Sequence, residues 1–374
     1  MRRGVPVVVV LLACLSGSSS PSFGEPLAFV AHPEANVVGI LDLLRNELLL
    51  PPVPTAASPL ALAARPDGRF VLVAQSGADS VSVLDVDARA ILLSVGVGDE
   101  PRSVAFAPDG RWAFVVNAGS ADVSVVDGES FEVVGTLPLG GVPQKVAVSP
   151  DGRRALVTDL AGRVWSIDAE EPSVEGSFPL AGAPFGVAFS PDAARAYVTL
   201  QLPNELAEVE IASGEVLRRF GVGSCPQEVV LHPSGAEAYV TVQAFDRVDV
   251  VDLASGTVAS VPVGDAPTGL ALSADARFLY VANSAFRTVS VVDLARRSVA
   301  REIGVFENPF AIAVLPPPPG DANCDGRRTA ADFPRIVSLL AEGMGLPCGA
   351  DADRDGSLTV SDVDFLARLV FASR

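Results

Sequence analysis

Lysine and histidine are scarce in this chain of 374 residues, which has one lysine, Lys145, and two histidines, His32 and His232. So few histidines argue against a histidine-rich metal site or a proton relay, and a single lysine leaves little room for amine chemistry. Aromatic residues make up 6% of the chain, which is too few for base-stacking platforms. Acidic residues outnumber basic ones by 45 to 27, a net charge of −18, so we expect no nucleic-acid partner.

Long apolar runs are also missing, and none reaches the roughly 18 residues that a membrane span needs. The sequence therefore predicts no transmembrane span. Arg2 and Arg3 precede a short apolar run, Val5 to Leu12, and then small residues, an order typical of an export signal. We expect a signal peptide over residues 1–24 and an exported protein, extracellular or at the cell surface of a bacterium. The alternative is a lipoprotein, because the residues before Cys14 resemble a bacterial lipobox.

Between its ends the chain repeats itself every 41 or 42 residues. The period is marked by a Pro-Asp-Gly turn, whose middle position is occupied in successive copies by Asp67, Asp109, Asp151, Asp192, Ser234 and Asp275. Most copies open after a Gly-x-x-Pro corner and then contain four short apolar strands, such as Ser103 to Phe106, Trp112 to Val116, Val123 to Asp127 and Phe131 to Leu137. Strands this short, separated by frequent turn signals and without a helical pattern, predict one four-stranded antiparallel blade per repeat.

The number of blades follows from the incomplete repeats at the two edges. Six complete repeats begin at Pro59, Pro101, Pro143, Pro184, Pro226 and Pro267. Ala28 to Ala31 and Val38 to Asp42 match only the second and third strands, and Pro309 to Val314 match only the first. We therefore predict an all-β, seven-bladed propeller over residues 25–315, in which a split blade joins the two ends and closes the ring.

The runs that begin at Val104 (Val-Ala-Phe-Ala-Pro-Asp-Gly) and at Ala196 (Ala-Tyr-Val-Thr) resemble the repeats of YVTN-family β-propellers. The resemblance covers about 290 residues, and the WD40 signatures are absent. It implies a propeller fold, usually in exported or surface proteins of prokaryotes. It does not fix an activity, because related propellers bind proteins and polymers or carry lactonase or dehydrogenase sites.

Repetition separates scaffold residues from candidate functional ones, because one active site cannot use seven copies of a residue. The acids that end each third strand recur in every blade and are interpreted as turn or cap residues: Asp42, Asp85, Asp127, Asp168, Glu210, Asp252 and Asp293. Function is expected where blades differ, at the mouth formed by the Gly-x-x-Pro corners, for an unknown ligand. The candidate mouth residues are Asp99, Arg102, Gln144, Lys145, Phe185, Gln227, Glu228 and Thr268. No nucleophile–base pair is recognisable among them, so no catalytic residue is assigned.

The proline-rich linker over residues 316–320 leads to a segment of different character, residues 321–374. Two stretches there have oxygen-bearing residues at loop positions 1, 3, 5 and 12 and glycine at 6, the pattern of an EF-hand calcium loop. With the backbone carbonyl at position 7 and a water held at position 9, the predicted ligands are Asp321, Asn323, Asp325, Arg327, Thr329 and Asp332, then Asp351, Asp353, Asp355, Ser357, Thr359 and Asp362. The sequence therefore predicts two calcium ions, with an apolar helix after each loop.

Paired loop-then-helix units with aspartate at position 12 resemble a type I dockerin. The resemblance implies docking onto a cohesin-type module or another surface or scaffold protein. In that family, loop positions 10 and 11 take part in recognition, and here they are Ala330, Ala331, Val360 and Ser361. The alanine pair and Pro334 depart from the common pattern, which leaves the identity of the partner open.

Cys324 and Cys348 are the two cysteines of this C-terminal segment. An exported chain permits disulfides, so we expect these two to be joined. The alternative is a pair of free thiols.

Two functions are consistent with these features. The first is a secreted, non-enzymatic binding or scaffold protein whose tail attaches it to a partner through calcium. The second is a propeller enzyme, lactonase-like or glycan-active, which its dockerin-like tail delivers to a polysaccharide-degrading assembly.

Overall fold

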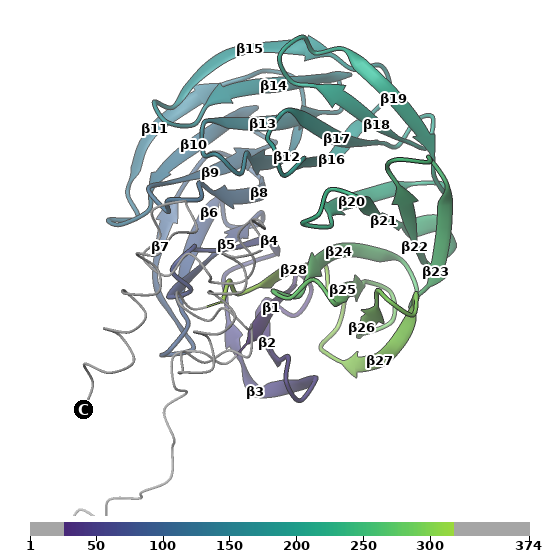
Figure 1. The fold of residues 1–374 in the computed structure, drawn as a ribbon. Helices are drawn as coiled ribbons and strands as arrows, with labels where there is room; N and C mark the ends of the chain where they lie inside the picture. Colours follow the sequence, from purple (N-terminus) through teal and green to yellow (C-terminus); the bar gives the residue numbers. More distant parts are fainter. Residues whose placement is uncertain (1–25, 318–374) are drawn as a thin grey trace, which may run out of the picture.

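A computed structural model describes residues 26–317, which form a ring of seven four-stranded antiparallel sheets around a central axis (Figure 1). The predicted seven-bladed propeller is therefore confirmed. We number the blades in chain order: blade 1 is β4–β7, blade 2 is β8–β11, blade 3 is β12–β15, blade 4 is β16–β19, blade 5 is β20–β23 and blade 6 is β24–β27. Blade 7 is the split blade, with the strand order β28-β1-β2-β3.

Each blade runs from an innermost strand at the axis to an outermost strand at the rim (Figure 1). The innermost strands are β28 (Ala311–Val314), β4 (Pro59–Ala64), β8 (Pro101–Phe106), β12 (Pro143–Val148), β16 (Pro184–Phe189), β20 (Pro226–Leu231) and β24 (Pro267–Leu272). The second strands are β1 (Leu27–His32), β5 (Phe70–Gln75), β9 (Trp112–Asn117), β13 (Arg154–Asp159), β17 (Arg195–Leu200), β21 (Glu237–Val242) and β25 (Phe278–Asn283).

The third strands are β2 (Val37–Asp42), β6 (Ser80–Asp85), β10 (Asp122–Asp127), β14 (Arg163–Asp168), β18 (Glu205–Glu210), β22 (Arg247–Asp252) and β26 (Thr288–Asp293). The outermost strands are β3 (Glu47–Pro54), β7 (Ala90–Gly96), β11 (Val133–Pro138), β15 (Ser173–Pro179), β19 (Val216–Gly221), β23 (Val258–Pro262) and β27 (Ser298–Gly304). One 3₁₀ turn, η1 (Gln243–Phe245), lies between β21 and β22. No helix of residues 26–317 has the length and apolarity needed to cross a membrane.

The ring closes in blade 7, where the last strand of the propeller pairs with the first. Strand β28 lies antiparallel to β1, with Val30 opposite Ile312 and Ala28 opposite Val314. Closure of this kind completes the seventh sheet, so that β1 is not left as an exposed edge strand, which would be a template for aggregation. The two incomplete repeats at the ends of the sequence are thus one blade in space, as predicted.

The hydrophobic core consists of seven clusters, and each cluster combines side chains of two neighbouring blades. Phe29 of blade 7 packs with Val71 of blade 1, for example, and Tyr239 of blade 5 packs with Leu279 of blade 6. Second strands are almost wholly buried, whereas outermost strands alternate between half-buried and exposed positions. A blade therefore buries its two faces only against its neighbours, which is why the repeats are stable as a ring.

Strand boundaries differ from the prediction by one or two residues, and one of these differences has a clear physical reason. The fourth strand of blade 2 begins at Val133 rather than Phe131. Phe131 has a left-handed backbone, with φ of 59°, and its side chain is buried against Phe70 of blade 1. The aromatic ring is therefore a core contact made from a turn, which an apolar pattern alone does not distinguish from the start of a strand.

Several predictions concern segments outside residues 26–317 and stay predictions. They are the signal peptide and Cys14, the calcium ligands from Asp321 to Asp362 with their two ions and helices, the docking positions Ala330, Ala331, Val360 and Ser361, and the disulfide between Cys324 and Cys348.

Candidate functional site

The predicted mouth residues lie at the axial end where the innermost strands begin. Five of them directly follow the proline that opens their innermost strand: Arg102, Gln144, Phe185, Gln227 and Thr268. Lys145 and Glu228 are one residue further along β12 and β20, and Asp99 lies in the corner before β8. The repeated corner thus brings residues of different blades to the same level of the axis.

Lys145 and Glu228 form an ion pair across the axial channel. The Lys145 Nζ lies 2.6 Å from the Glu228 Oε2, although the two residues belong to blades 3 and 5, which are not adjacent. Both side chains are mostly buried, at 15% and 22% exposure, and the ammonium also lies 6.0 Å from the centre of the Phe185 ring. The only lysine of the chain, on blade 3, is therefore held near the axis by the carboxylate of Glu228 on blade 5.

Small residues occupy the same level on the other innermost strands: Ala61, Ser103, Gly186, Gly269 and Ala311. Gly186 of blade 4 is required by sterics, because a Cβ there would lie 2.4 Å from the Gln227 carbonyl oxygen of blade 5. Gly269 is similar, with a Cβ position 2.7 Å from the Phe310 carbonyl oxygen. Neighbouring innermost strands therefore approach each other closely at the level that also carries the Lys145–Glu228 pair.

Arg102, the second residue of β8, is held by two acceptors. Its Nη1 donates to the Gln144 side-chain oxygen at 3.1 Å, and its Nη2 donates to the Glu100 carboxylate at 3.3 Å. The Gln144 amide nitrogen in turn donates to the carbonyl oxygens of Val142 and Pro143. Because Gln144 directly precedes Lys145, the Arg102–Gln144 bond and the Lys145–Glu228 pair lie at nearly the same level of the innermost strands, and we call these four residues the axial cluster.

The remaining predicted mouth residues have structural roles. Thr268 is buried, and its hydroxyl donates to the Phe310 carbonyl oxygen of blade 7 at 2.8 Å. The Asp99 backbone N–H donates to the Ser120 hydroxyl, so this residue belongs to the corner of blade 2. The Gln227 amide nitrogen turns away from the axis to Cys225 Sγ and the Gln243 side chain. The structure therefore does not bring these three residues into the axial cluster.

Threonines of the second strands connect blades 3, 4 and 5 to their neighbours. In each case the hydroxyl accepts a backbone N–H of its own blade and donates to a carbonyl oxygen of the next blade. Thr199 shows the pattern: it accepts from Gly186 at 2.7 Å and donates to the Gln227 oxygen at 2.7 Å. Thr158 and Thr241 do the same toward Phe185 and Thr268. These bonds hold β12 and β20, the innermost strands that carry Lys145 and Glu228, in place.

Three large apolar side chains project from the turns around this mouth. Leu202, Phe245 and Phe286 occupy the turn between the second and third strands in blades 4, 5 and 6, and they are 70%, 57% and 59% exposed. These turns lie against the Gly-x-x-Pro corners, as the bond from the Gln243 N–H to the Cys225 oxygen shows. We call these three side chains the apolar rim. Sequence reasoning missed them. The signal was a difference between blades, because the other four blades have no aromatic residue or leucine exposed at this turn.

His32 lies at the end of β1 and is fully buried. Its Nδ1 is 3.1 Å from the Glu307 carbonyl oxygen, its ring meets Phe306 edge-on, and its Nε2 has no partner among the described residues. Burial lowers the pKa of His32 to about 4. A neutral, enclosed imidazole of this kind is a packing group of the split blade.

The recurring acids at the ends of third strands cap the following turns, as expected for scaffold residues. Asp127, for example, accepts the backbone N–H groups of Glu129 and Ser130, and the Ser130 bond holds the pKa of Asp127 below its usual value. Asp42, Asp85, Asp168, Asp252 and Asp293 accept turn N–H groups in the same way, and Glu210 accepts the Ser213 hydroxyl.

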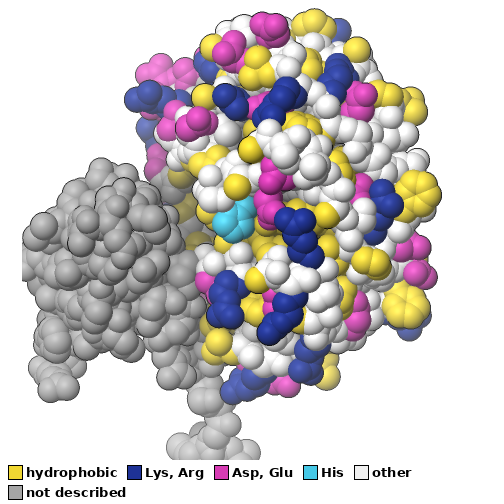
Figure 2. Space-filling model, turned by 45° about the vertical axis from the view of Figure 1, so that its right-hand side comes forward, with side chains coloured by type: hydrophobic (Ala, Val, Ile, Leu, Met, Phe, Trp, Pro, Cys, Tyr) yellow, Lys and Arg dark blue, Asp and Glu magenta, His cyan; other side chains and the backbone are white. Residues whose placement is uncertain are grey.

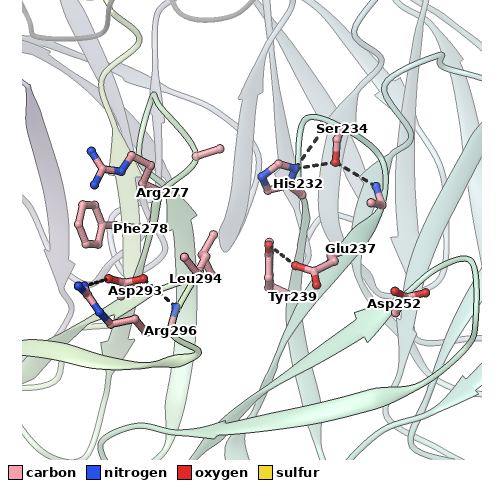
Figure 3. A pocket seen from close by; sticks show the side chains of 13 residues that line it. His232, Ser234, Glu237, Tyr239, Asp252, Arg277, Phe278, Asp293, Leu294 and Arg296 are labelled. Atoms are coloured by element: carbon pink, nitrogen blue, oxygen red, sulfur yellow. Dashed lines mark hydrogen bonds and ion pairs between the residues drawn. The ribbon is translucent and has the colours of Figure 1, made fainter.

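A cleft of about 630 Å³ opens at the opposite end of the blades, between blades 5 and 6 (Figure 3). It is lined by the Pro-Asp-Gly-type turns and the turns after the third strands, with His232, Tyr239, Arg277 and Phe278 among its walls. Sequence reasoning did not predict a cleft there. The signal was present, because blade 5 alone has His232 and Ser234 where blades 3, 4 and 6 have serine and aspartate.

Comparison with known proteins supports the fold. The model of the YNCE-like beta-propeller family matches residues 52–169, which extend from the last strand of the split blade into blade 3. A comparison with curated protein sequences finds no match.

Solved structures resemble the chain over most of its length. Hydrazine synthase of Kuenenia stuttgartiensis has 22% identity and a TM-score of 0.63, with 68% of this chain and 88% of that chain covered. A protein of unknown function from Desulfotomaculum acetoxidans has 19% identity and a TM-score of 0.68, with coverage of 77% and 98%. A candidate 6-phosphogluconolactonase from Bacteroides uniformis has 18% identity and a TM-score of 0.66, with coverage of 78% and 100%. At these identities the similarity concerns the fold alone.

Proposed function

We propose that this chain is a binding protein whose propeller recognises a protein partner through the mouth face and whose C-terminal segment attaches it elsewhere through calcium. The observation that carries the first part is the apolar rim, three side chains each more than half exposed on adjacent blades around the axial cluster. Large apolar residues gathered on one face of a soluble domain mark interaction sites more often than chance exposure does.

The arrangement has the composition of a protein interface. Phe245 and Phe286 offer rigid aromatic anchors, and Arg247 stacks on the Phe245 ring at 5.3 Å. Aromatic and arginine side chains are enriched among residues that dominate binding energy. The charges of the axial cluster are already paired with one another, which suits orientation of a partner better than nucleophilic attack.

The attachment function rests on the calcium-loop pattern of the sequence. Asp321, Asn323 and Asp325 with Asp332, and Asp351, Asp353 and Asp355 with Asp362, supply the hard oxygen ligands that Ca²⁺ prefers. Metal binding to such a small segment supplies much of its folding energy, so attachment would depend on calcium. The partner would be a cohesin-type or other scaffold module on the surface of an exporting bacterium.

Two variants of the full chain test whether a partner binds at the mouth face or elsewhere on the propeller. Leu202→Ser, Phe245→Ser and Phe286→Ser together remove the apolar rim, and Leu50→Ser, Leu92→Ser and Val134→Ser remove equally exposed side chains of outermost strands as the control. A photo-cross-linking residue at the exposed position 285, next to Phe286, should label a partner from the envelope fraction of the source organism, and one at position 92 should not. Cross-linking that survives the rim variant, or that is equal at both positions, would contradict the proposal.

Calorimetric titration of the full chain tests the calcium loops. We expect two ions per chain, one in a variant with Asp321→Ala and Asp325→Ala, and none when Asp351→Ala and Asp355→Ala are added. Heat of binding that is unchanged by these substitutions would place calcium elsewhere.

A catalytic propeller is the second candidate, because the charged pair of Lys145 and Glu228 lies at the axial mouth and one structural neighbour is a candidate lactonase. Hydrolysis of small sugar lactones by the full chain, lost in Glu228→Gln, would favour this function. If the full chain hydrolyses no lactone but still cross-links a partner through the apolar rim, the binding function is favoured.

A further inference from the structure

The loops at the two ends of the propeller differ in charge. At the mouth, the turns between second and third strands and the corners between blades contain seven acidic residues and one basic residue, Arg287. The loops at the opposite end contain eleven acidic and nine basic residues. Figure 2 shows this mixture around a histidine, which is His232 because His32 is fully buried. The mouth loops are therefore almost entirely of one sign, and the opposite face is mixed.

The basic side chains of the mouth are already neutralised by acids of the propeller itself. Six basic residues of the described chain lie in the mouth loops or within three residues of them, and each forms an ion pair. The pairs are Arg102–Glu100, Lys145–Glu228, Arg163–Asp159, Arg219–Glu205, Arg247–Asp249 and Arg287–Glu307. No basic side chain of this face is therefore left over for an acidic partner.

Five exposed acids of the mouth loops have no ion pair among residues 26–317: Glu34, Asp79, Asp99, Asp246 and Asp265. Asp79 and Asp246 accept only a backbone N–H of the next corner, at 2.9 Å in both cases. A neutral donor of this kind leaves the charge of a carboxylate in place. Unpaired charges of one sign around an opening attract groups of the opposite sign.

Two of these carboxylates lie beside the aromatic anchors of the apolar rim. Asp246 directly follows Phe245 in the turn of blade 5. Asp265 lies in the next corner, and its backbone oxygen accepts the N–H of Ala285, the residue before Phe286. Each exposed ring therefore has an unpaired carboxylate next to it.

A pocket of about 410 Å³ extends this face from blade 6 to blade 7. It is lined by Ser284, Ala285 and Arg287 of blade 6 and by Glu34, Glu307 and Asn308 of blade 7 and the corner before it. Arg287 neutralises Glu307, whereas Glu34 accepts only the neutral Asn308 amide, at 3.2 Å. The pocket thus keeps one net negative charge and has room for a long basic side chain.

We propose, resting on the protein-binding function above, that the partner is a basic and apolar protein segment, in which lysine or arginine residues flank aromatic or aliphatic ones. Its apolar side chains contact the apolar rim, and its basic side chains pair with Asp246, Asp265 and, in the pocket, Glu34. Charge complementarity of this kind steers the encounter and disfavours acidic partners.

Two other occupants of the rim lack this complementarity. A second copy of the chain that bound mouth to mouth would bring the same unpaired acids together. The C-terminal segment of the same chain, residues 321–374, has nine acidic and six basic residues and is itself negative. Sedimentation velocity of the full chain alone should therefore show no dimer. A dimer that the Leu202, Phe245 and Phe286 triple variant abolishes would make a second copy the occupant and overturn the proposal.

A random peptide library displayed on phage is the probe for the chemistry of the partner. Peptides selected on the full chain should be enriched in lysine or arginine together with aromatic residues or leucine, and the triple variant should not recover them. Apolar peptides without this basic enrichment would overturn the basic partner but keep the protein-binding function. Basic peptides that the triple variant recovers equally, or no enrichment at all, would contradict both.

Matched variants locate the attraction. Glu34→Gln, Asp246→Asn and Asp265→Asn together remove three charges from the mouth and keep the acceptor oxygens. The control is Asp87→Asn, Glu171→Gln and Glu215→Gln, which removes three exposed acids from the opposite end. The affinity of a selected peptide, measured by fluorescence anisotropy, should fall about tenfold or more in the mouth variant and less than about twofold in the control. An equal loss in both variants would mean attraction by the overall charge and overturn the proposal.

Discussion

Blades 3–5 and blades 1, 2 and 6 use the ends of their second strands in different ways. In blades 3–5, which we call the threonine arc, the hydroxyls of Thr158, Thr199 and Thr241 bond to the next blade. In blades 1, 2 and 6, the amide arc, a buried side chain at the next position bonds to serines of its own third strand instead. Asn117, for example, donates to Ser124 at 2.9 Å.

The difference shows that the ends of equivalent strands in a repeat can serve cohesion between blades or rigidity within a blade. Gln75 and Asn283 complete the amide arc, with bonds to Ser82 and Ser290. The Lys145–Glu228 pair joins the first and third blades of the threonine arc. The arc with direct links between blades is thus also the arc that carries the Lys145–Glu228 pair.

Blade 7 provides the strongest test of what the amide position requires, because there it holds His32. The pKa of His32 falls to about 4 on folding, from about 6.5, since burial disfavours the charged ring. Its contribution to stability is therefore complete above pH 6.5 and is lost as the pH falls toward 4, to a total of about 3 kcal/mol. Urea unfolding at pH 7 and pH 4.5 should show this loss. In His32→Asn, which has the side chain of blades 2 and 6, the pH dependence should be smaller by that amount, and an unchanged dependence would refute the assignment.

Close approach within the threonine arc is tested at Gly186. A Cβ at Gly186 would lie 2.4 Å from the Gln227 carbonyl oxygen, so Gly186→Ala must push β16 and β20 apart. We expect the free energy of unfolding to fall by about 2 to 3 kcal/mol. Gly221→Ala is the control, because nothing lies within 4 Å of its Cβ position. Equal stability of the two variants would mean that the inner ring accommodates a methyl group.

The bonds between blades are tested with Thr199→Val, which keeps the shape of the side chain. The substitution leaves the Gly186 N–H and the Gln227 oxygen without their hydroxyl partner. A loss of about 1 to 2 kcal/mol in denaturant unfolding is expected. Thr136→Val on exposed strand β11 should change stability by less than about 0.5 kcal/mol. If both variants unfold alike, the threonine arc has no special cohesion.

The smallest effect is expected for the axial ion pair. A double-mutant cycle with Lys145→Gln and Glu228→Gln should give a coupling free energy of about 1 kcal/mol, because the pair is mostly but not fully buried. Coupling near zero would show that the two charges are held in place by the ring rather than by each other.

The fold could be predicted because its signals are local. Turn residues and strand alternation recur within each repeat, and the split blade follows from which strands are missing at the edges. Strand ends differed by one or two residues where a core side chain is supplied from a turn, as at Phe131. The number of blades, and the strands that belong to each, could therefore be predicted from the period of the repeat.

The site could be predicted only in part, because its contacts depend on the ring. Lys145 and Glu228 are 83 positions apart, and their pairing follows from the geometry of blades 3 and 5 rather than from any local pattern. Thr268 looked equivalent to Arg102, but its short side chain bonds to the next blade and is buried. The cleft was missed because the change at His232 and Ser234 resembles ordinary variation of a turn until the neighbouring blade is known.

The pairing of β28 with β1 also determines when the propeller can be completed during synthesis. Strands β1–β3 leave the ribosome first, and their partner β28 follows more than 250 residues later. Until then the nascent chain is an open arc whose first strand has a free edge, and every later blade must form beside it. A circular permutant that begins at Ala311, with β28 directly before β1, would turn this slow long-range closure into a local hairpin and should fold faster.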